Sequence, residues 1–137
     1  MAAYFADASY WIALITSTDK FHELAVEYAT LLENEEILTT QMVLNEVLNP
    51  RSGTNRQGRI AAVEMVDRIL EDPRVVVIPQ TAGQFEEAFN LLRNRADDKE
   101  WSITDCASFL TMWQRGTWNA LTNDHHFRQA WFAVLLR

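Results

Sequence analysis

Short apolar segments alternate along this sequence with longer segments of helical periodicity, and this alternation constrains the fold more than any other feature. Four segments predict buried strands: residues 4–6 (YFA), 36–40 (EILTT), 75–79 (VVVIP) and 118–122 (WNALT). Between them, apolar residues recur every three or four positions, as on one face of a helix. The pattern is typical of an α/β fold with a central parallel β-sheet flanked by α-helices on both faces.

Helix breakers fall between these segments. We expect Pro50 to close the helix that carries Glu46, Gly116 to follow the helix starting near Ser102, and Asp72 with Pro73 to separate a helix from the VVVIP strand. The polar segment 49–58 (NPRSGTNRQG) is the most loop-like. Since no repeat or linker is visible and 137 residues is near the commonest domain size, we expect a single domain over 1–137.

The composition narrows the chemistry. The only cysteine is Cys106, so an intramolecular disulfide and a thiolate metal cluster from this chain alone are excluded, and any metal must be held by oxygen or imidazole. No stretch approaches the ~20 consecutive apolar residues of a membrane span, and the start lacks the basic flank of a signal peptide, so we expect a cytoplasmic protein. The net charge of −7 argues against a protein that coats nucleic acid.

Four acidic residues are predicted to converge. Asp7 ends the first strand and Asp124 follows the last of the four, and ligands of a parallel sheet bind outside the carboxyl ends of its strands. The first strand is usually central, and a late strand lies beside it if the winding changes direction. Glu46 lies in an otherwise apolar helical stretch, where a buried carboxylate is costly without a partner, and Asp105 lies near a helix start.

Clustered carboxylates stay ionised at neutral pH only if a cation compensates them. Hard oxygen ligands, with no cysteine and no imidazole pair, select Mg²⁺ or Mn²⁺ over zinc or copper. Such a site activates water and holds a scissile phosphate, so the predicted reaction is hydrolysis of a phosphodiester. The sequence therefore predicts a metal-dependent hydrolase in which no protein nucleophile is required.

With these pieces in order, the chain resembles the PIN-domain family, and especially its VapC-type toxin ribonucleases of type II toxin–antitoxin systems, over essentially its whole length. The matching segments are FADASYW with Asp7 and Ser9, LNEVLN with Glu46, WSITDCASF with Asp105, and ALTNDHHF with Asp124. Near the C-terminus, the family often has a glycine where this chain reads QAWF over 129–132. That departure leaves the path of the last strand around Trp131 open.

The resemblance implies a PIN-like fold and an endoribonuclease dependent on Mg²⁺ or Mn²⁺. It carries the acidic quartet onto Asp7, Glu46, Asp105 and Asp124 as catalytic residues and metal ligands, and matches Ser9 and Thr122 to hydroxyls that support the site. It also implies an RNA substrate, a homodimer and a cognate antitoxin. The antitoxin would block the site by inserting a basic side chain among the carboxylates.

Each acid also has a simpler interpretation. Asp105 could complete a capping box with Ser102, and Asp124 could be an ordinary turn residue. Asp7 could cap the following helix, and Glu46 could be a half-exposed helix carboxylate. Two other functions remain open: a catalytically silent PIN-like protein-binding module, and a haloacid-dehalogenase-type phosphohydrolase, which would need an aspartate at the position of Ser9.

The remaining candidates concern RNA and partners. Removing the four acids changes the net charge from −7 to −3, so local charge matters more than the total. Two basic groups could hold RNA phosphates or simply be solvated: Arg51, Arg56 and Arg59, which we favour, and Arg93, Arg95 and Lys99. We expect the adjacent His125 and His126 to point in different directions as surface or substrate-facing residues, Cys106 to be a core residue, and Trp11 to be an interface candidate.

Overall fold

The structure of the protein, a computed structural model, describes residues 2–52 and 55–137, although for 50–52 it describes the backbone alone. In this part of the chain, five parallel strands form one sheet in the order β3-β2-β1-β4-β5. The strands are β1 (Tyr4–Ala6), β2 (Ile37–Thr40), β3 (Val75–Ile78), β4 (Asn119–Leu121) and β5 (Ala133–Val134). The helices are α1 (Ala8–Ile15), α2 (His22–Leu31), α3 (Gln41–Ser52), α4 (Arg56–Glu71), α5 (Ala82–Arg95), α6 (Ile103–Arg115) and α7 (His125–Gln129).

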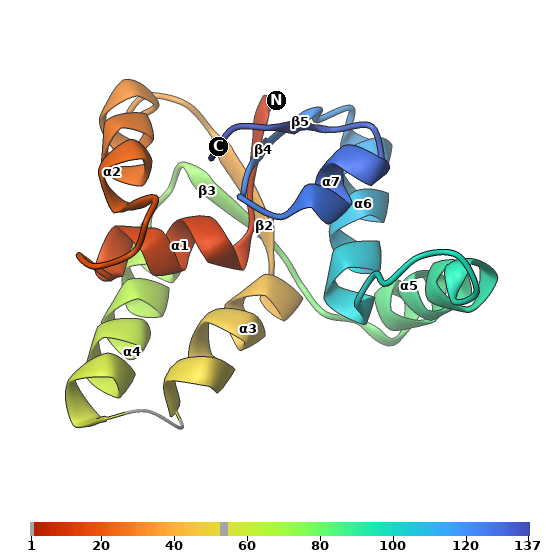
Figure 1. Cartoon of the computed structure of the whole chain (residues 1–137), viewed down its shortest axis with the longest axis horizontal. Helices are drawn as coiled ribbons and strands as arrows, with labels where there is room; N and C mark the ends of the chain where they lie inside the picture. Colours follow the sequence, from red (N-terminus) through yellow and green to blue (C-terminus); the bar gives the residue numbers. More distant parts are fainter. Residues whose placement is uncertain (1, 53–54) are drawn as a thin grey trace.

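The strand order places β1 at the centre, with β2 on one side and β4 on the other. The chain winds outward from β1 to β3 and then returns to β4, so the direction of winding reverses between β1 and β4. Figure 1 shows α1, α2 and α4 grouped on one side of the sheet, α5, α6 and α7 on the other, and α3 below the strand ends. The predicted α/β architecture and the pairing of the first strand with a late one are confirmed.

Two predictions about the segment after Glu46 are wrong. Helix α3 does not close at Pro50 but runs to Ser52, because a proline removes only its own N–H bond and the turn after it can still form. Helix α4 already starts at Arg56, since the side chain of Asn55 caps it by accepting from the Gly58 N–H at 2.8 Å. The loop expected over 49–58 is therefore helical over 49–52 and again from 56, and residues 53 and 54 lie outside the described residues.

The last strand, whose path the sequence left open, pairs in parallel with β4. Between α7 and β5 the chain turns at Trp131, which has a φ of 74° and so occupies the left-handed region that favours glycine. Its side chain is 87% exposed, whereas the next residue, Phe132, is buried and packs against Trp113 and Trp118 with ring centroids 5.8 and 5.5 Å apart. Phe132 thus anchors the turn.

The core joins the sheet to α6 through aromatic contacts. Phe109 lies edge-on to Trp101 and to Phe127, with centroids 4.9 and 5.0 Å apart, and Cys106 is buried beside it as expected. Trp11, expected at an interface, is also buried, with 6% exposure, because α1 packs it towards α4. None of the described helices is both long and apolar enough to cross a membrane.

Candidate metal centre

Asp7 stands at the junction of β1 and α1, where the sheet meets its first helix. Its backbone N–H donates to the carbonyl of Leu121 at 3.1 Å, which ties the end of β1 to the end of β4. Its buried carboxylate does not cap α1 but accepts a hydrogen bond from the Thr122 hydroxyl at 2.8 Å. The capping interpretation of Asp7 is therefore wrong, and the carboxylate is oriented by the neighbouring strand.

The Thr122 hydroxyl is the hub of this junction. Besides donating to Asp7, its oxygen accepts from the backbone N–H of Asp124 at 3.1 Å. The Ser9 hydroxyl lies 3.1 Å from it and accepts from the Asn123 N–H at 3.1 Å. Because the single Thr122 proton goes to Asp7, Ser9 must be the donor of the bond that the two hydroxyls share. This chain of hydroxyls fixes Asp7 relative to Asp124.

Asp105 combines the two roles that the sequence left open. It forms a capping box with Ser102, in which the Ser102 hydroxyl accepts from the Asp105 N–H at 3.0 Å and the carboxylate accepts from the Ser102 N–H at 3.1 Å. The same carboxylate oxygen lies 3.1 Å from Nδ1 of His126, across in α7. The cap therefore holds Asp105 in place without turning it away from the other acids.

Asp124 begins α7 and likewise caps it, accepting from the His126 N–H at 2.9 Å. Glu46 approaches from α3, whose first turn is fixed by a hydrogen bond from the Val43 N–H to the Thr40 hydroxyl at 3.1 Å. The Glu46 carboxylate is half-buried, hydrogen-bonds to Thr104, and lies close enough to Asp105 and Asp124 to feel their charges.

The electrostatics of the four acids are coupled. Burial, together with smaller contributions from the charges of Glu46 and Asp105, raises the pKa of Asp7 to about 7, and the hydrogen bonds from Thr122 and the Ala8 N–H only partly offset this rise. Burial also raises the pKa of Glu46, and the charges of Asp105 and Asp124 add to that shift. The pKa of Asp105 rises mainly through burial and also through Asp124. The structure therefore brings all four predicted acids around one space in which their negative charges repel.

Among the described ion pairs, no buried lysine or arginine compensates these carboxylates. Carboxylate oxygens that repel one another in this way fit a divalent cation, which would supply the missing positive charge. One compact donor group in the described part of the chain combines Asp124 with His125 and His126, whose donor atoms lie within 4.8 Å of one another.

The two histidines are the residues that sequence reasoning placed wrongly. Their rings do not diverge but lie with centroids 4.4 Å apart, because α7 starts at Asp124 and its first turn bends both towards the same side. His125 is mostly exposed, whereas His126 turns its ring between Asp105 and Asp124. The available signal was that a histidine two residues after a helix-capping aspartate lies over that cap.

The predicted basic groups lie on the molecule's outer helices. Arg56 and Arg59 are exposed in the first turn of α4, not in a loop, and the side chain of Arg51 lies outside the described residues. Arg95 and Lys99 pair with Asp98 at 2.9 and 3.9 Å, and Arg93 bonds to Asn90. The second group is therefore engaged within its own surface, whereas exposure alone describes Arg56 and Arg59.

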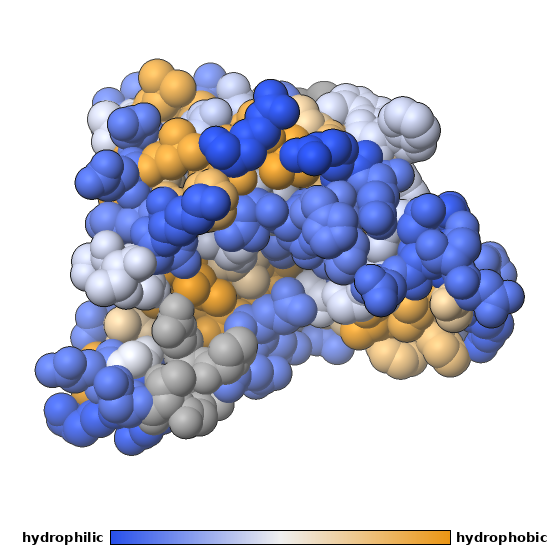
Figure 2. Space-filling view, in the orientation of Figure 1, coloured by the Kyte–Doolittle hydropathy of each residue, from blue (hydrophilic) through white to orange (hydrophobic). Residues whose placement is uncertain are grey.

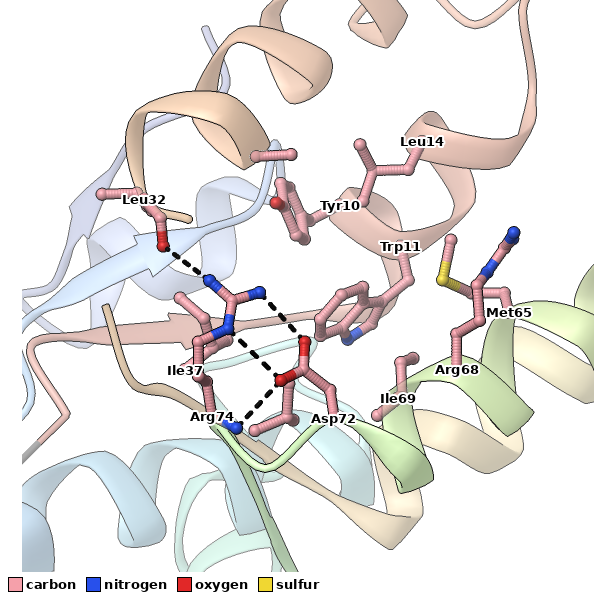
Figure 3. A pocket seen from close by; sticks show the side chains of 12 residues that line it. Tyr10, Trp11, Leu14, Leu32, Ile37, Met65, Arg68, Ile69, Asp72 and Arg74 are labelled. Atoms are coloured by element: carbon pink, nitrogen blue, oxygen red, sulfur yellow. Dashed lines mark hydrogen bonds and ion pairs between the residues drawn. The ribbon is translucent and has the colours of Figure 1, made fainter. Parts of the chain in front are cut away.

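A separate apolar pocket lies between α1, α2 and α4, away from the acids, with a volume of about 190 Å³. Figure 3 shows the Trp11 ring inside it beside Met65 and Ile69, with the Arg74–Asp72 ion pair on its rim. The Trp11 Nε1 is buried and has no hydrogen-bond partner among the described residues. An unsatisfied buried donor of this kind is costly.

Comparisons with known proteins identify the family. The sequence model of the PIN domain matches residues 4–132. The "23S rRNA-specific endonuclease VapC20" of Mycobacterium tuberculosis is 29% identical over 131 residues, which cover 93% of this chain and 94% of that protein. The crystal structure of M. tuberculosis VapC20, described as a "Sarcin-Ricin loop cleaving toxin", has a TM-score of 0.80 at 31% identity and covers 95% of this chain and 96% of its own.

More distant structures share the fold. VapBC2 from Rickettsia felis, bound to a DNA fragment from their promoter, gives a TM-score of 0.65 at 16% identity, covering 96% of this chain and 95% of that one. FitAcB from Neisseria gonorrhoeae gives 0.65 at 16% identity, with 96% of each chain covered. At this identity the likeness speaks for the fold alone.

The raised pKa of Asp7 makes stability depend on pH. Because the folded-state pKa of about 7 exceeds the ordinary value of 3.8, the native state binds more protons than the unfolded one between these values, and stability should fall as pH rises from about 4 to about 7. In a chelator, the free energy of unfolding should drop by up to about 1.4 kcal/mol per pH unit in this window. Chemical denaturation at several pH values measures the slope.

Two variants assign this slope. Asp7→Asn should flatten much of it, whereas Asp67→Asn, which changes an exposed carboxylate of α4, should leave it as in the parent. Adding a divalent ion at pH 8 should restore the stability that the parent has lost. A slope that survives unchanged in Asp7→Asn would show that Asp7 is not the group responsible.

Proposed function

Since this chain belongs to the PIN-domain family, as the match over residues 4–132 shows, we propose that it is a metal-dependent endoribonuclease and the toxin of a toxin–antitoxin pair. The observation that carries the proposal is the coupled cluster of Asp7, Glu46, Asp105 and Asp124 at the carboxyl ends of β1 and β4. The haloacid-dehalogenase alternative lacks its second aspartate because Ser9 stands there, bonded to Thr122.

In the proposed mechanism each residue has a defined task. Asp7 and Asp124 would be the principal metal ligands, and Glu46 and Asp105 would complete the site or orient the attacking water. Ser9 and Thr122 support the site, since their hydroxyls set the position of Asp7. A bound Mg²⁺ or Mn²⁺ would supply positive charge beside the scissile phosphate and make a nucleophilic water available at neutral pH. No side chain forms a covalent bond to the substrate.

The substrate class is RNA. The relatedness to VapC20, named for its action on 23S rRNA, supports an RNA phosphodiester as the target, without fixing which RNA is cleaved. An enzyme with that substrate would act in the cytoplasm. The silent-module alternative is disfavoured because all four acids are present and coupled, which a purely structural role does not need.

The cleavage proposal predicts a strict dependence on the acids. Asp7→Asn and Asp124→Asn should each lower the rate of Mg²⁺- or Mn²⁺-dependent cleavage of structured RNA by at least about a hundredfold, because each removes charge that holds the ion. Asp67→Asn should cleave like the parent. The assay is the appearance of fragments from a labelled rRNA stem-loop with and without chelator. Equal inactivity of the parent and Asp7→Asn towards mixed RNA would instead indicate a silent module.

We assign RNA backbone contacts to Arg51, Arg56 and Arg59, because α4 packs against the Glu46 helix and presents Arg56 and Arg59 to solvent. In an Asp7→Asn background, which stops cleavage, replacing Arg56 and Arg59 with Ala should weaken RNA binding and reduce the salt slope by about 1.4, for two lost phosphate contacts. Fluorescence anisotropy at salt concentrations from about 50 to about 200 mM measures this slope. Arg115→Ala, at the far end of α6 from Asp105, is the control; an unchanged slope discards the assignment.

Two surfaces of the molecule are candidates for binding partners, one for an antitoxin and one for a second copy of this chain. The pocket between α1, α2 and α4 offers an apolar hollow lined by Trp11, Leu14 and Met65 with the Arg74–Asp72 ion pair on its rim, which suits an amphipathic antitoxin segment. The solved VapBC2 complex supports a partner of this class. Helix α5 exposes Phe85 and Phe89, whose rings lie 6.0 Å apart, as a surface for a second copy; Figure 2 shows apolar side chains gathered over that end of the molecule.

These surfaces can be separated with one pair of variants. The antitoxin for this test is the product of a short gene beside this one. Leu14→Lys places a charge at the pocket, so it should abolish co-purification with the antitoxin while the chain still sediments as a dimer. Phe89→Glu should retain the antitoxin but make the chain sediment as a monomer. Pull-down and sedimentation velocity are the measurements. Retention of the antitoxin by Leu14→Lys would place its binding elsewhere, and a monomeric parent would remove the homodimer.

A further inference from the structure

His126 brings an imidazole nitrogen into the acidic cluster. Its Nδ1 lies 3.1 Å from a carboxylate oxygen of Asp105 and 3.3 Å from one of Asp124. Its side chain is 17% exposed, compared with 68% for the neighbouring His125. The backbone N–H of His126 also donates to Asp124, so the first turn of α7 fixes where the ring begins. The acidic quartet leaves this nitrogen without an assigned task.

The spacing of these atoms is that of neighbouring ligands on one ion. Two adjacent ligands of an octahedral ion, each about 2.1 Å from the metal, lie about 3 Å apart. The Nδ1 keeps nearly that separation from both Asp105 and Asp124. The compact donor group formed by Asp124, His125 and His126 points the same way, because it contains two imidazoles and a single carboxylate.

We propose that Nδ1 of His126 is a ligand of the divalent ion, beside Asp124 and Asp105, and that it makes the site prefer Mn²⁺ to Mg²⁺. The inference rests on the metal site of the proposed function and adds the choice of ion. Mg²⁺ strongly prefers oxygen and gives up its waters reluctantly, whereas imidazole suits the transition-metal ions. A nitrogen within the ligand shell therefore stabilises Mn²⁺ more than Mg²⁺.

The geometry also defines the state that the ion replaces. Without an ion, an ionised Asp105 only accepts, so the Nδ1 that faces it at 3.1 Å donates, while Asp124 lies 3.3 Å away on the other side. To hold an ion, the ring would release the Nδ1 proton to solvent and present the Nδ1 lone pair, with its remaining proton on Nε2. Asp105 remains held by the Ser102 N–H throughout, which keeps one side of the ligand set in place.

The variant that tests this is His126→Asn, because the asparagine amide reaches roughly the position of Nδ1 and still offers a hydrogen bond and an oxygen ligand. His125→Asn is the matched control on the adjacent exposed ring. Titration of Mn²⁺, followed by the electron paramagnetic resonance signal of the free ion, gives its affinity, and competition gives that of Mg²⁺. Circular dichroism in chelator confirms that each variant is folded.

In His126→Asn, Mn²⁺ binding should weaken about 10- to 100-fold, while Mg²⁺ binding changes by no more than about threefold. Pulsed electron paramagnetic resonance of the Mn²⁺-loaded parent should show coupling to an imidazole ¹⁴N nucleus that is lost in His126→Asn and retained in His125→Asn. These readouts do not depend on RNA cleavage.

Three results would overturn the assignment. Equal weakening of both ions would make His126 a positioning residue that only orients the carboxylates. Absence of nitrogen coupling in the parent, with Mn²⁺ bound, would exclude imidazole ligation altogether. Loss of the coupling in His125→Asn alone would transfer the role to His125. If the parent protein binds neither ion, the metal site of the proposed function is itself contradicted. That outcome is distinguishable from the three above, in which the parent binds an ion.

Discussion

Repulsion among four part-buried carboxylates is the constraint on which the rest of this structure depends. Burial disfavours each charge, and the charges of neighbouring acids, including Asp124, raise the pKa values of Asp7, Glu46 and Asp105 further. The fold meets this cost locally by giving the acids hydrogen-bond donors: the Thr122 hydroxyl for Asp7, the Ser102 N–H for Asp105, and the His126 N–H for Asp124. These donors orient the carboxylates but leave the net negative charge in place.

Helix placement offers a second form of compensation. Asp7 precedes α1, Asp105 lies in the first turn of α6, and Asp124 caps α7, so three acids stand at helix N-termini. The partial positive charge of a helix start favours a nearby anion. For Asp7 and Asp124 this arrangement follows from the topology, because in a parallel sheet the chain passes from the carboxyl end of a strand into the start of the next helix; Asp105 instead opens α6, which follows α5. The same feature that gathers the acids also makes them tolerable.

The parts of the fold that depend on local pattern could be predicted from the sequence. Apolar runs gave the strands from β1 to β4, and the reversal of winding put β4 beside β1, which is why Asp7 and the residues after Leu121 meet. Other features depend on tertiary contacts that no local pattern encodes. Trp131 adopts a left-handed conformation because Phe132 must reach its aromatic neighbours, and the ring of His126 lies over Asp105 only because α7 folds back on α6.

The acidic total of the chain acquires a physical meaning from this geometry. A phosphodiester approaching the ion-free cluster would meet four carboxylates, so the same charges that bind the cation oppose the RNA. A bound divalent ion reverses that local sign, and substrate binding then depends on metal binding before any chemistry takes place. Arg56 and Arg59 on α4 cannot substitute for it, because they are exposed and act through screened, longer-range attraction. In the proposed function the ion is therefore needed twice, to admit the phosphate and to help break it.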